Sequence, residues 1–169
     1  MNNGYTAVRV DCVHSGDFLV VGDKSYERTQ FHFHPPSEEY IHGRQYDMVL
    51  HLMHKSSDGK VAGVAVLLKA GSANPTIQQL LEYMPKTEGK PEEIAGVEVN
   101  PENLVPHNTG YYTHLGSQTA LPCTEGVAWF VLKTPVEMSG EQIDAFAKPY
   151  PHDVRPLQPR NVRVVKASQ

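Results

Sequence analysis

The chain has 169 residues, the length of one ordinary globular domain, which is enough to bury a single sizeable core. Its 15 lysines and arginines against 19 aspartates and glutamates leave a formal net charge of −4, which removes the long-range attraction that a phosphate backbone or an anionic membrane would exploit. The longest apolar run, 61–68, is far shorter than the roughly 20 residues of a membrane-spanning helix. We therefore expect one domain over residues 1–169, with neither nucleic acid nor a membrane as partner.

The first half of the chain predicts strands. Residues 7–10 and 18–21 are short β-branched or aromatic runs separated by a Ser-Gly-Asp turn, a pattern typical of a β-meander. Residues 29–34 and 46–54 alternate with period 2, so each predicts a strand with two different faces. The nearly continuous apolar run 61–68 indicates a central strand that is buried on both faces.

Two short helices are predicted farther along. Asn74 followed by Pro75 is an N-cap with proline at the first helical position, and apolar residues then recur at helical spacing to about Pro85. The Ser-Gly-Glu-Gln sequence at 139–142 has the form of a capping box and predicts a second helix that ends before Pro149. Residues 86–105 predict a surface loop, and 128–132 the last strand.

The chain carries nine histidines, and several of them cluster in the region of the alternating strands. His32 and His34 are two residues apart on one strand, so both imidazoles point to the same face and can share one cation. His51 lies among apolar neighbours on the next predicted strand, where an unpaired polar group costs about 1–3 kcal/mol. Three neutral imidazoles that leave one position open are the layout of a catalytic zinc site. The competing interpretation is two histidines on a solvated strand face with no metal.

At this point the motifs carry a resemblance. The sequence Gln-Phe-His-Phe-His-Pro-Pro-Ser-Glu at 30–38, with Leu-His-Leu-Met-His at 50–54, resembles the zinc-binding centre of the α-class carbonic anhydrases. The similarity extends from Asn2 to the basic end of the chain. The further motifs follow in the family's order, at 71–75, 111–112, 116–129, 131–133 and 155–159.

The resemblance implies a mainly β (α+β) fold with a central, twisted, mostly antiparallel sheet and a few short surface helices. It implies an enzyme that hydrates carbon dioxide reversibly to bicarbonate and a proton by zinc-hydroxide attack. The residues it assigns are the following: His32, His34 and His51 as Zn2+ ligands, Gln30 as the hydrogen-bond partner of His32, Thr119 and Glu38 as the catalytic pair that orients the nucleophile, and Val127, Gln118 and Ala120 in the substrate pocket.

Three departures from the family pattern bear on activity. Tyr5 stands where many active members have a proton-shuttle histidine, and its ordinary pKa near 10 suits it badly to relay protons near neutrality. Val49 stands where a carboxylate usually precedes the third zinc histidine by two positions, so His51 loses its usual acceptor. Ala120 replaces a second threonine at the rim of the pocket. Together these changes put the rate and the metal affinity in question.

The chain resembles an N-terminally shortened member of the family, because the segment that usually precedes the Asn-Asn-Gly motif has no counterpart here. A missing cover would leave a sheet edge and apolar surface open, which predicts a homodimer that meets near residues 1–10. Cys123 matches a cysteine that often pairs with one in that opening segment. The family's bacterial members are commonly periplasmic or secreted, but the first twenty residues carry no signal-peptide pattern, so the compartment stays unassigned.

Two alternatives remain open. The first is a binding protein of the same fold that has weak or no catalysis, because supporting positions have changed while the three histidines, Thr119 and Glu38 are retained. The second is a cupin-type metal enzyme, because His32, His34 and Glu38 also fit the first cupin motif, although no second cupin motif follows.

Overall fold

The structure is a computed structural model, and it describes residues 8–12, 16–84, 97–149 and 154–169. Within these residues the chain is mainly β, with two α-helices and one 3₁₀ helix. The elements follow one another in this order: β1 (Val8–Asp11), β2 (Phe18–Val21), β3 (Lys24–His34), β4 (Tyr40–Ile41), β5 (Arg44–Gln45), β6 (Met48–Ser56), β7 (Val61–Ala70), α1 (Pro75–Glu82), η1 (Pro101–Leu104), β8 (Tyr111–Ser117), β9 (Glu125–Leu132), β10 (Val136–Met138), α2 (Gly140–Ala147) and β11 (Lys166–Ala167).

A single nine-stranded sheet organises the molecule. Its order is β1-β3-β6-β7-β9-β8-β11, with β2 paired to β3 and β10 paired to β7. The contacts of β7 with β9 and β10 are parallel, and the other pairs in this sheet are antiparallel. The strand predicted from the apolar run thus lies in the middle of the sheet, as expected, and the mainly β fold class is confirmed.

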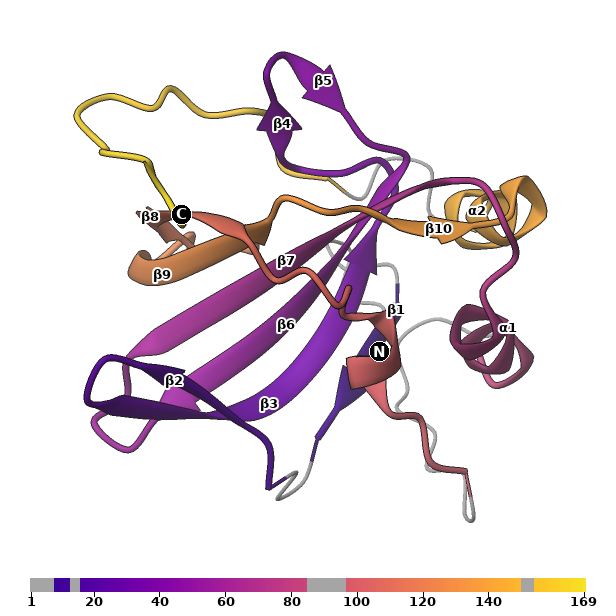
Figure 1. Cartoon of the computed structure of the whole chain (residues 1–169), viewed down its shortest axis with the longest axis horizontal. Coiled ribbons are helices and arrows are strands. Elements are labelled where there is room, and N and C mark those ends of the chain that lie inside the picture. The colour runs from indigo at the N-terminus through magenta and orange to yellow at the C-terminus, as the bar shows by residue number, and fades with distance from the viewer. Residues whose placement is uncertain (1–7, 13–15, 85–96, 150–153) are drawn as a thin grey trace.

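The sheet divides the buried side chains between two faces. On one face Phe33, Leu50 and Leu68 pack together with Ile77 of α1 and Phe146 of α2. Figure 1 shows the two helices close together at one end of the sheet, beside β10. On the opposite face lies a smaller apolar cluster that consists of Val49, Met53, Ala65, Leu67, Val127, Trp129 and Val131. The alternation predicted for β3 and β6 is the reason for this division.

The pairing of β3 with β6 places the histidines. His32 stands directly opposite His51 across this antiparallel pair, and His34 lies two residues farther along β3. Side chains two residues apart on a strand share a face, so all three imidazoles project to the face that carries Trp129. His54, three residues beyond His51, is buried on the other side of β6 as a packing residue.

Both helix caps match the sequence expectation. Asn74 caps α1, because its side-chain oxygen accepts hydrogen bonds from the backbone N–H groups of Thr76 and Ile77. Ser139 and Gln142 form the capping box of α2. The loop predicted at 86–105 is described only from residue 97 onward, and there it contains η1. None of the described helices is long and apolar enough to cross a membrane.

Candidate metal centre

Three buried imidazoles meet on one face of the sheet. The side chains of His32, His34 and His51 are 7%, 1% and 0% exposed, and their metal-binding atoms all lie within 4.8 Å of one another. Of these atoms, His32 Nε2 and His51 Nδ1 lie 3.3 Å apart. The two central strands β3 and β6 supply all three rings, so the cluster sits on a rigid part of the fold.

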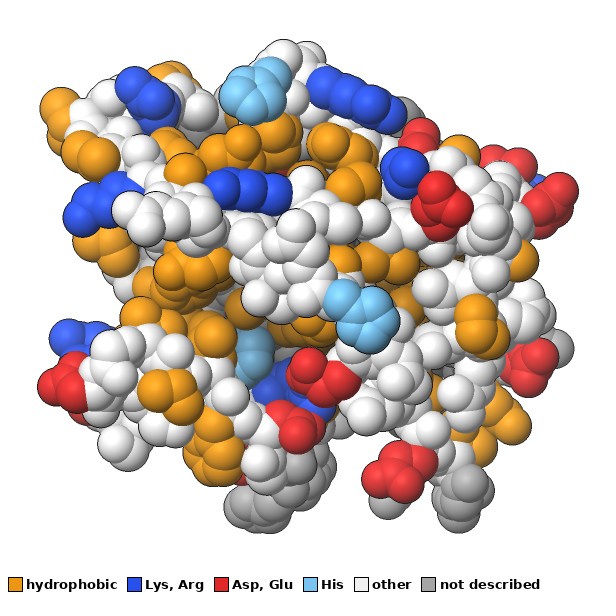
Figure 2. Space-filling model, viewed as in Figure 1, with side chains coloured by type: hydrophobic (Ala, Val, Ile, Leu, Met, Phe, Trp, Pro, Cys, Tyr) orange, Lys and Arg blue, Asp and Glu red, His pale blue; other side chains and the backbone are white. Residues whose placement is uncertain are grey.

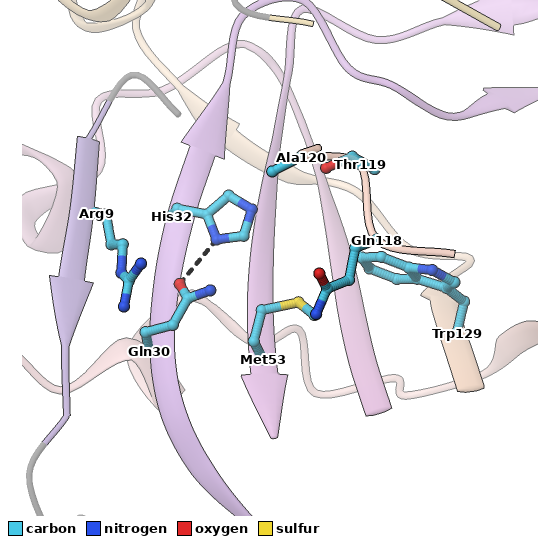
Figure 3. Close-up of a pocket in the computed structure, with 8 residues that line it drawn as sticks. All are labelled: Arg9, Gln30, His32, Met53, Gln118, Thr119, Ala120 and Trp129. Atoms are coloured by element: carbon cyan, nitrogen blue, oxygen red, sulfur yellow. Dashed lines mark hydrogen bonds between the residues drawn. The ribbon is translucent and has the colours of Figure 1, made fainter. Parts of the chain in front are cut away.

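Oxygen acceptors fix two of the three rings from outside. His32 Nδ1 donates to Gln30 Oε1 at 2.8 Å, a contact visible in Figure 3. His51 Nε2 donates to Glu39 Oε1 at 2.8 Å. Each bond places the ring proton on the outer nitrogen, because a carboxylate and an amide oxygen can only accept. The lone pairs of His32 Nε2 and His51 Nδ1 then both face the centre of the cluster.

This arrangement fits a zinc ion. When both rings are neutral, His32 Nε2 and His51 Nδ1 turn lone pairs toward each other across 3.3 Å, and a shared cation satisfies both of them. Metal-bound histidines ordinarily donate their outer N–H to an oxygen, as His32 and His51 do here. Zinc prefers imidazole ligands in this number, and no carboxylate belongs to the group of converging metal-binding atoms found among the described residues.

A carboxylate that the sequence analysis did not anticipate reaches His51. Val49 offers this ring no acceptor, as expected, but Glu39 supplies one from another part of the chain. Burial by itself raises the pKa of Glu39, but the charge of His51 and the hydrogen bond to it outweigh burial and lower that pKa, so Glu39 is ionised at neutral pH. Burial by itself lowers the pKa of His51, but the charge of Glu39, the hydrogen bond to it and the charge of Glu38 together raise that pKa above its ordinary value.

The pKa of His32 is well below its usual range, first because of burial and then because of the neighbouring His51, His34 and Arg9. The ring is therefore neutral at physiological pH and available to a metal. Arg9 reaches this environment because it pairs with His32 across β1 and β3.

Glu38 lies directly beside the histidine cluster. Its Oε1 accepts a hydrogen bond from the backbone N–H of Arg155 at 2.7 Å. Its Oε2 lies 3.5 Å from His34 Nε2 and 3.9 Å from His51 Nδ1. The hydrogen bond expected between Thr119 and Glu38 is not formed among the described residues. Glu38 Oε2 instead faces the histidine rings and has no hydrogen-bond partner there.

A cavity of about 170 Å³ opens beside His32. Figure 3 shows Arg9 entering from β1, Gln30 and His32 from β3, Met53 from β6 and Trp129 from β9. The turn after β8 supplies the remaining lining residues, which are Gln118, Thr119 and Ala120. Val127 lies outside this lining; it is 2% exposed and belongs to the apolar cluster with Val49 and Trp129. Tyr5 lies outside the described residues.

Four residues near the site were missed by the sequence interpretation: Arg9, Glu39, Met53 and Arg155. The period-2 pattern of 46–54 did place Met53 on the same face as His51, so this residue could have been found. Glu39 and Arg155 gave no such signal, because they reach the site from loops whose path no spacing rule predicts.

A larger, more open groove borders the same site. Its lining includes Glu38, Glu39 and His114, together with residues 155–161, Arg163 and Val165 of the C-terminal segment. Apolar side chains of the C-terminal segment are largely exposed next to it, with Leu157 at 66%, Val162 at 95% and Val164 at 69%. Figure 2 shows one face of the molecule, where hydrophobic side chains are visible over its upper and middle parts.

The fold and the site define a class of protein: a large twisted sheet with a three-histidine metal centre on one face. Residues 1–169 match the model of the eukaryotic-type carbonic anhydrase family, and the chain belongs to that family. This membership sets the cupin alternative aside. The chain spans only part of the length of its curated relatives: it covers 62% of the Nostoc protein described below.

Three relatives illustrate the similarity. A carbonic anhydrase of Nostoc is 38% identical over 165 residues, which are 98% of this chain. The α-carbonic anhydrase of Thermovibrio ammonificans, solved with sulfanilamide, superposes with a TM-score of 0.90 at 38% identity and covers 97% of this chain and 72% of its own. Dioscorin dioA3 of Dioscorea japonica is 33% identical over 97% of this chain and 62% of its own length.

Proposed function

We propose that this chain hydrates carbon dioxide reversibly to bicarbonate and a proton, with Zn2+ held by His32, His34 and His51. The observation that carries the proposal is the converging cluster of buried imidazoles, in which outer oxygen acceptors leave two inner nitrogens free to bind a metal. The carbonic anhydrases among its relatives support the same reaction.

Zinc bound by three histidines supplies a water molecule whose pKa falls to about 7, a value known from carbonic anhydrase itself. The protein's own residues do the rest. Gln30 and Glu39 hold two ligand rings in the productive tautomer. Trp129 and Met53 form an apolar part of the wall of the adjoining cavity, and this part of the wall suits an uncharged, nonpolar substrate.

The roles of the remaining site residues are part of the proposal. Thr119 and Glu38 form the pair that orients the attacking oxygen, for which Thr119 already lines the cavity and Glu38 already points at the ligand rings. Gln118 and Ala120 border the substrate next to Thr119. Val127 supports the pocket from the apolar cluster behind it.

A carbon dioxide hydration assay with and without added zinc, run beside a chelator-treated sample, tests the proposal. We expect stoichiometric zinc and activity that disappears with the chelator and returns with the metal. His34→Ala should abolish both, whereas His107→Ala, at an exposed position away from the cluster, should leave both unchanged. Wild-type protein that binds less than one zinc per chain contradicts the proposal.

A second candidate function is a binding protein with weak or absent catalysis. The specific observation that favours it is the missing hydrogen bond between Thr119 and Glu38 among the described residues. The 33% identity to dioscorin dioA3 is compatible with this candidate, because the name of that relative is not an enzyme name. Full zinc occupancy without carbon dioxide hydration would select this candidate over the enzyme.

Proton transfer is expected to limit the proposed enzyme. Tyr5 occupies the usual position of the shuttle histidine, and a phenol offers almost no proton acceptor near pH 7. Imidazole buffer should raise turnover, and Tyr5→His should raise it in weakly buffered solution. If neither change has an effect, Tyr5 does not limit the rate.

A homodimer that meets near residues 1–10 is the assembly that we propose, and residues 1–7 of that region lie outside the described residues. Elsewhere on the surface, the exposed Leu157, Val162 and Val164 also favour association. Light scattering over a tenfold dilution series checks it. A monomeric mass throughout, with a melting temperature independent of concentration, contradicts the dimer.

A further inference from the structure

Glu39 and His51 form a buried hydrogen-bonded pair that joins two distant parts of the chain. The Oε1 of Glu39 lies 2.8 Å from Nε2 of His51, and the side chains are 16% and 0% exposed. A charge-assisted bond this short and this sheltered from water is much stronger than an exposed one. Glu39 thus meets His51 on the side of the ring that faces away from the other two histidines.

Glu39 does not stand where the family resemblance predicts the carboxylate partner of the third histidine. The predicted position lies two residues before His51, on its own strand, and it holds Val49. Val49 is fully buried in the apolar cluster with Met53 and Trp129, so it offers His51 no acceptor. Glu39 comes instead from the loop between β3 and β4, directly after Glu38.

The loop that carries Glu39 is anchored by backbone and side-chain hydrogen bonds. Ser37 Oγ donates to the carbonyl of Glu39 at 2.9 Å and accepts from the backbone N–H of Tyr46 at 2.9 Å. The backbone N–H of Ser37 donates to the carbonyl of Tyr46, and Gln45 Nε2 donates to the carbonyl of Ser37. Ser37 itself is fully buried. These bonds through Ser37 tie the loop that carries Glu39 to Gln45 and Tyr46, just before β6, and so hold its carboxylate in place.

A second contact limits the rotation of the His51 ring. The indole of Trp129 lies 4.7 Å from it, centroid to centroid, at an interplanar angle of 55°. Trp129 is fixed in turn by donating its Nε1–H to the carbonyl of Ser117 at 3.0 Å. With the indole beside the ring and Glu39 at Nε2, the remaining nitrogen, Nδ1, faces His32 at 3.3 Å.

From these contacts we infer that Glu39 is the positioning residue of His51: it fixes the Nε2–H tautomer and the ring orientation that present Nδ1 to the metal, and it replaces from a separate loop the carboxylate that Val49 lacks. The inference rests on the proposed zinc site. It deepens that proposal by naming the residue on which the third ligand depends.

Zinc affinity, measured by competition with a chromophoric chelator, is the first test. Glu39→Ala should weaken zinc binding by about 10- to 100-fold, the range typical of lost hydrogen-bond partners of metal-bound histidines. Glu39→Gln keeps an acceptor without the charge and should lose less. Glu27→Ala removes a half-buried glutamate from the strand that carries His32 and His34, and it should bind zinc like wild type.

A relocated carboxylate separates positioning from general destabilisation. Val49 and His51 share a face of β6, so in the double variant Glu39→Ala, Val49→Glu the new carboxylate comes from His51's own strand. We expect it to recover at least tenfold of the lost affinity. Thermal unfolding monitored by circular dichroism establishes whether each variant is folded. If Glu39→Ala does not fold, the double variant is built on Glu39→Gln instead.

The tautomer of His51 in the metal-free protein gives a readout that does not depend on zinc. Nitrogen-15 NMR of the imidazole should show the Nε2–H form in wild type and a shift toward Nδ1–H in Glu39→Ala. An unchanged tautomer together with unchanged zinc affinity overturns the inference. Wild type that shows the Nε2–H form but binds no zinc refutes the proposed function instead, and leaves the role of Glu39 in fixing the ring supported.

Discussion

Two neighbouring glutamates in this chain have different partners. Glu38 accepts a hydrogen bond from the backbone N–H of Arg155 and turns its other oxygen toward His34, whereas Glu39 binds the outer nitrogen of His51. The two carboxylates thus lie near different nitrogens of the His51 ring, because Glu38 Oε2 is 3.9 Å from Nδ1 and Glu39 Oε1 is 2.8 Å from Nε2. Sequence alone selected Glu38 through a resemblance and had no reason to select Glu39.

Gly63 decides how closely Trp129 can approach the sheet. A Cβ at this position would lie 2.5 Å from Cζ3 of the indole, and a rigid ring on a central strand cannot yield cheaply. We expect Gly63→Ala to lower the free energy of unfolding by about 1–3 kcal/mol through overpacking. Urea unfolding followed by the fluorescence of Trp129 measures this directly, since the chain has 1 tryptophan.

Gly140→Ala is the matched control for Gly63→Ala, because a Cβ there has nothing within 4 Å and the residue begins helix α2. It should be neutral or slightly stabilising. Equal losses in the two variants would contradict the role assigned to the contact between Gly63 and Trp129.

His54 makes stability depend on pH. Burial first, and the nearby charge of Arg28 second, lower its pKa from 6.5 to about 4, against smaller opposing effects of backbone hydrogen bonds with Leu52 and Ala62 and of the charge of Asp17. The unfolded chain therefore binds more protons than the native one between these values, and stability falls as pH falls from 6.5 toward 4. We expect this single group to account for about 2 kcal/mol of the loss between pH 7 and pH 4.5.

His54→Met removes the titrating group and keeps an apolar side chain of similar length. Its free energy of unfolding, from urea titrations at pH 7 and pH 4.5, should fall by about 2 kcal/mol less than that of wild type. The three histidines of the metal centre are present in both proteins, so their own titration cancels in the comparison. Identical losses would mean that His54 is not a neutral buried histidine.

At the scale of the elements, Gln142 links the two helices. Its Oε1 accepts from the backbone N–H groups of Ser139 and Asn74, both at 3.0 Å, and its Nε2 donates to the carbonyl of Asn74 at 2.8 Å. One side chain thus completes the capping box of α2 and fastens the N-terminus of α1 to it. Gln142 is 4% exposed, so water replaces these bonds poorly.

We expect Gln142→Leu to destabilise the protein by about 2–4 kcal/mol, because three backbone groups lose their partner at once. Gln78→Leu, on the exposed side of α1, should change the free energy of unfolding by less than about 0.5 kcal/mol. Chemical denaturation of both variants checks the difference. A loss near 1 kcal/mol in Gln142→Leu would indicate that only one cap is affected.

Local patterns predicted the elements that have strong periodicity or explicit caps. β3, β6 and β7 followed from alternation and apolar runs, and α1 and α2 from Asn74 and the Ser139 capping box. β8 was missed because most of its side chains are half-buried on both faces, which leaves no alternation to detect. The short pair β4–β5 and strand β10 are two or three residues long, below what a pattern can specify.

The metal centre was likewise predictable only where the signal lies within a single strand. His32 and His34 follow from strand period, and His51 from its odd burial, because both signals lie within single strands. Contacts made by loops were not predictable: Glu39 reaches His51 only because Ser37 ties its loop to Tyr46, and Arg155 reaches Glu38 from a position 117 residues away. Such contacts depend on the completed fold.

At the scale of the whole molecule, the metal centre is attached to the middle of the sheet. All three histidines lie on β3 and β6, which pair with each other over most of their length, and β6 pairs in turn with the central strand β7. These strands also carry Phe33 and Leu50 of the main core on their other face. The ligands therefore separate only when the sheet and its core come apart.

This placement predicts that zinc acts on global unfolding. A ligand that binds only the native state stabilises it by about 4 kcal/mol when its free concentration is a thousand times Kd. For a chain of this size that corresponds to a rise in Tm of roughly 8–16 °C. Differential scanning calorimetry in zinc and in chelator should show the rise in wild type and in His107→Ala, and none in His34→Ala. If zinc binds stoichiometrically to wild type but leaves Tm unchanged, the ligands are held by a part of the structure that opens independently of the sheet, and the coupling argued from β3, β6 and β7 is wrong.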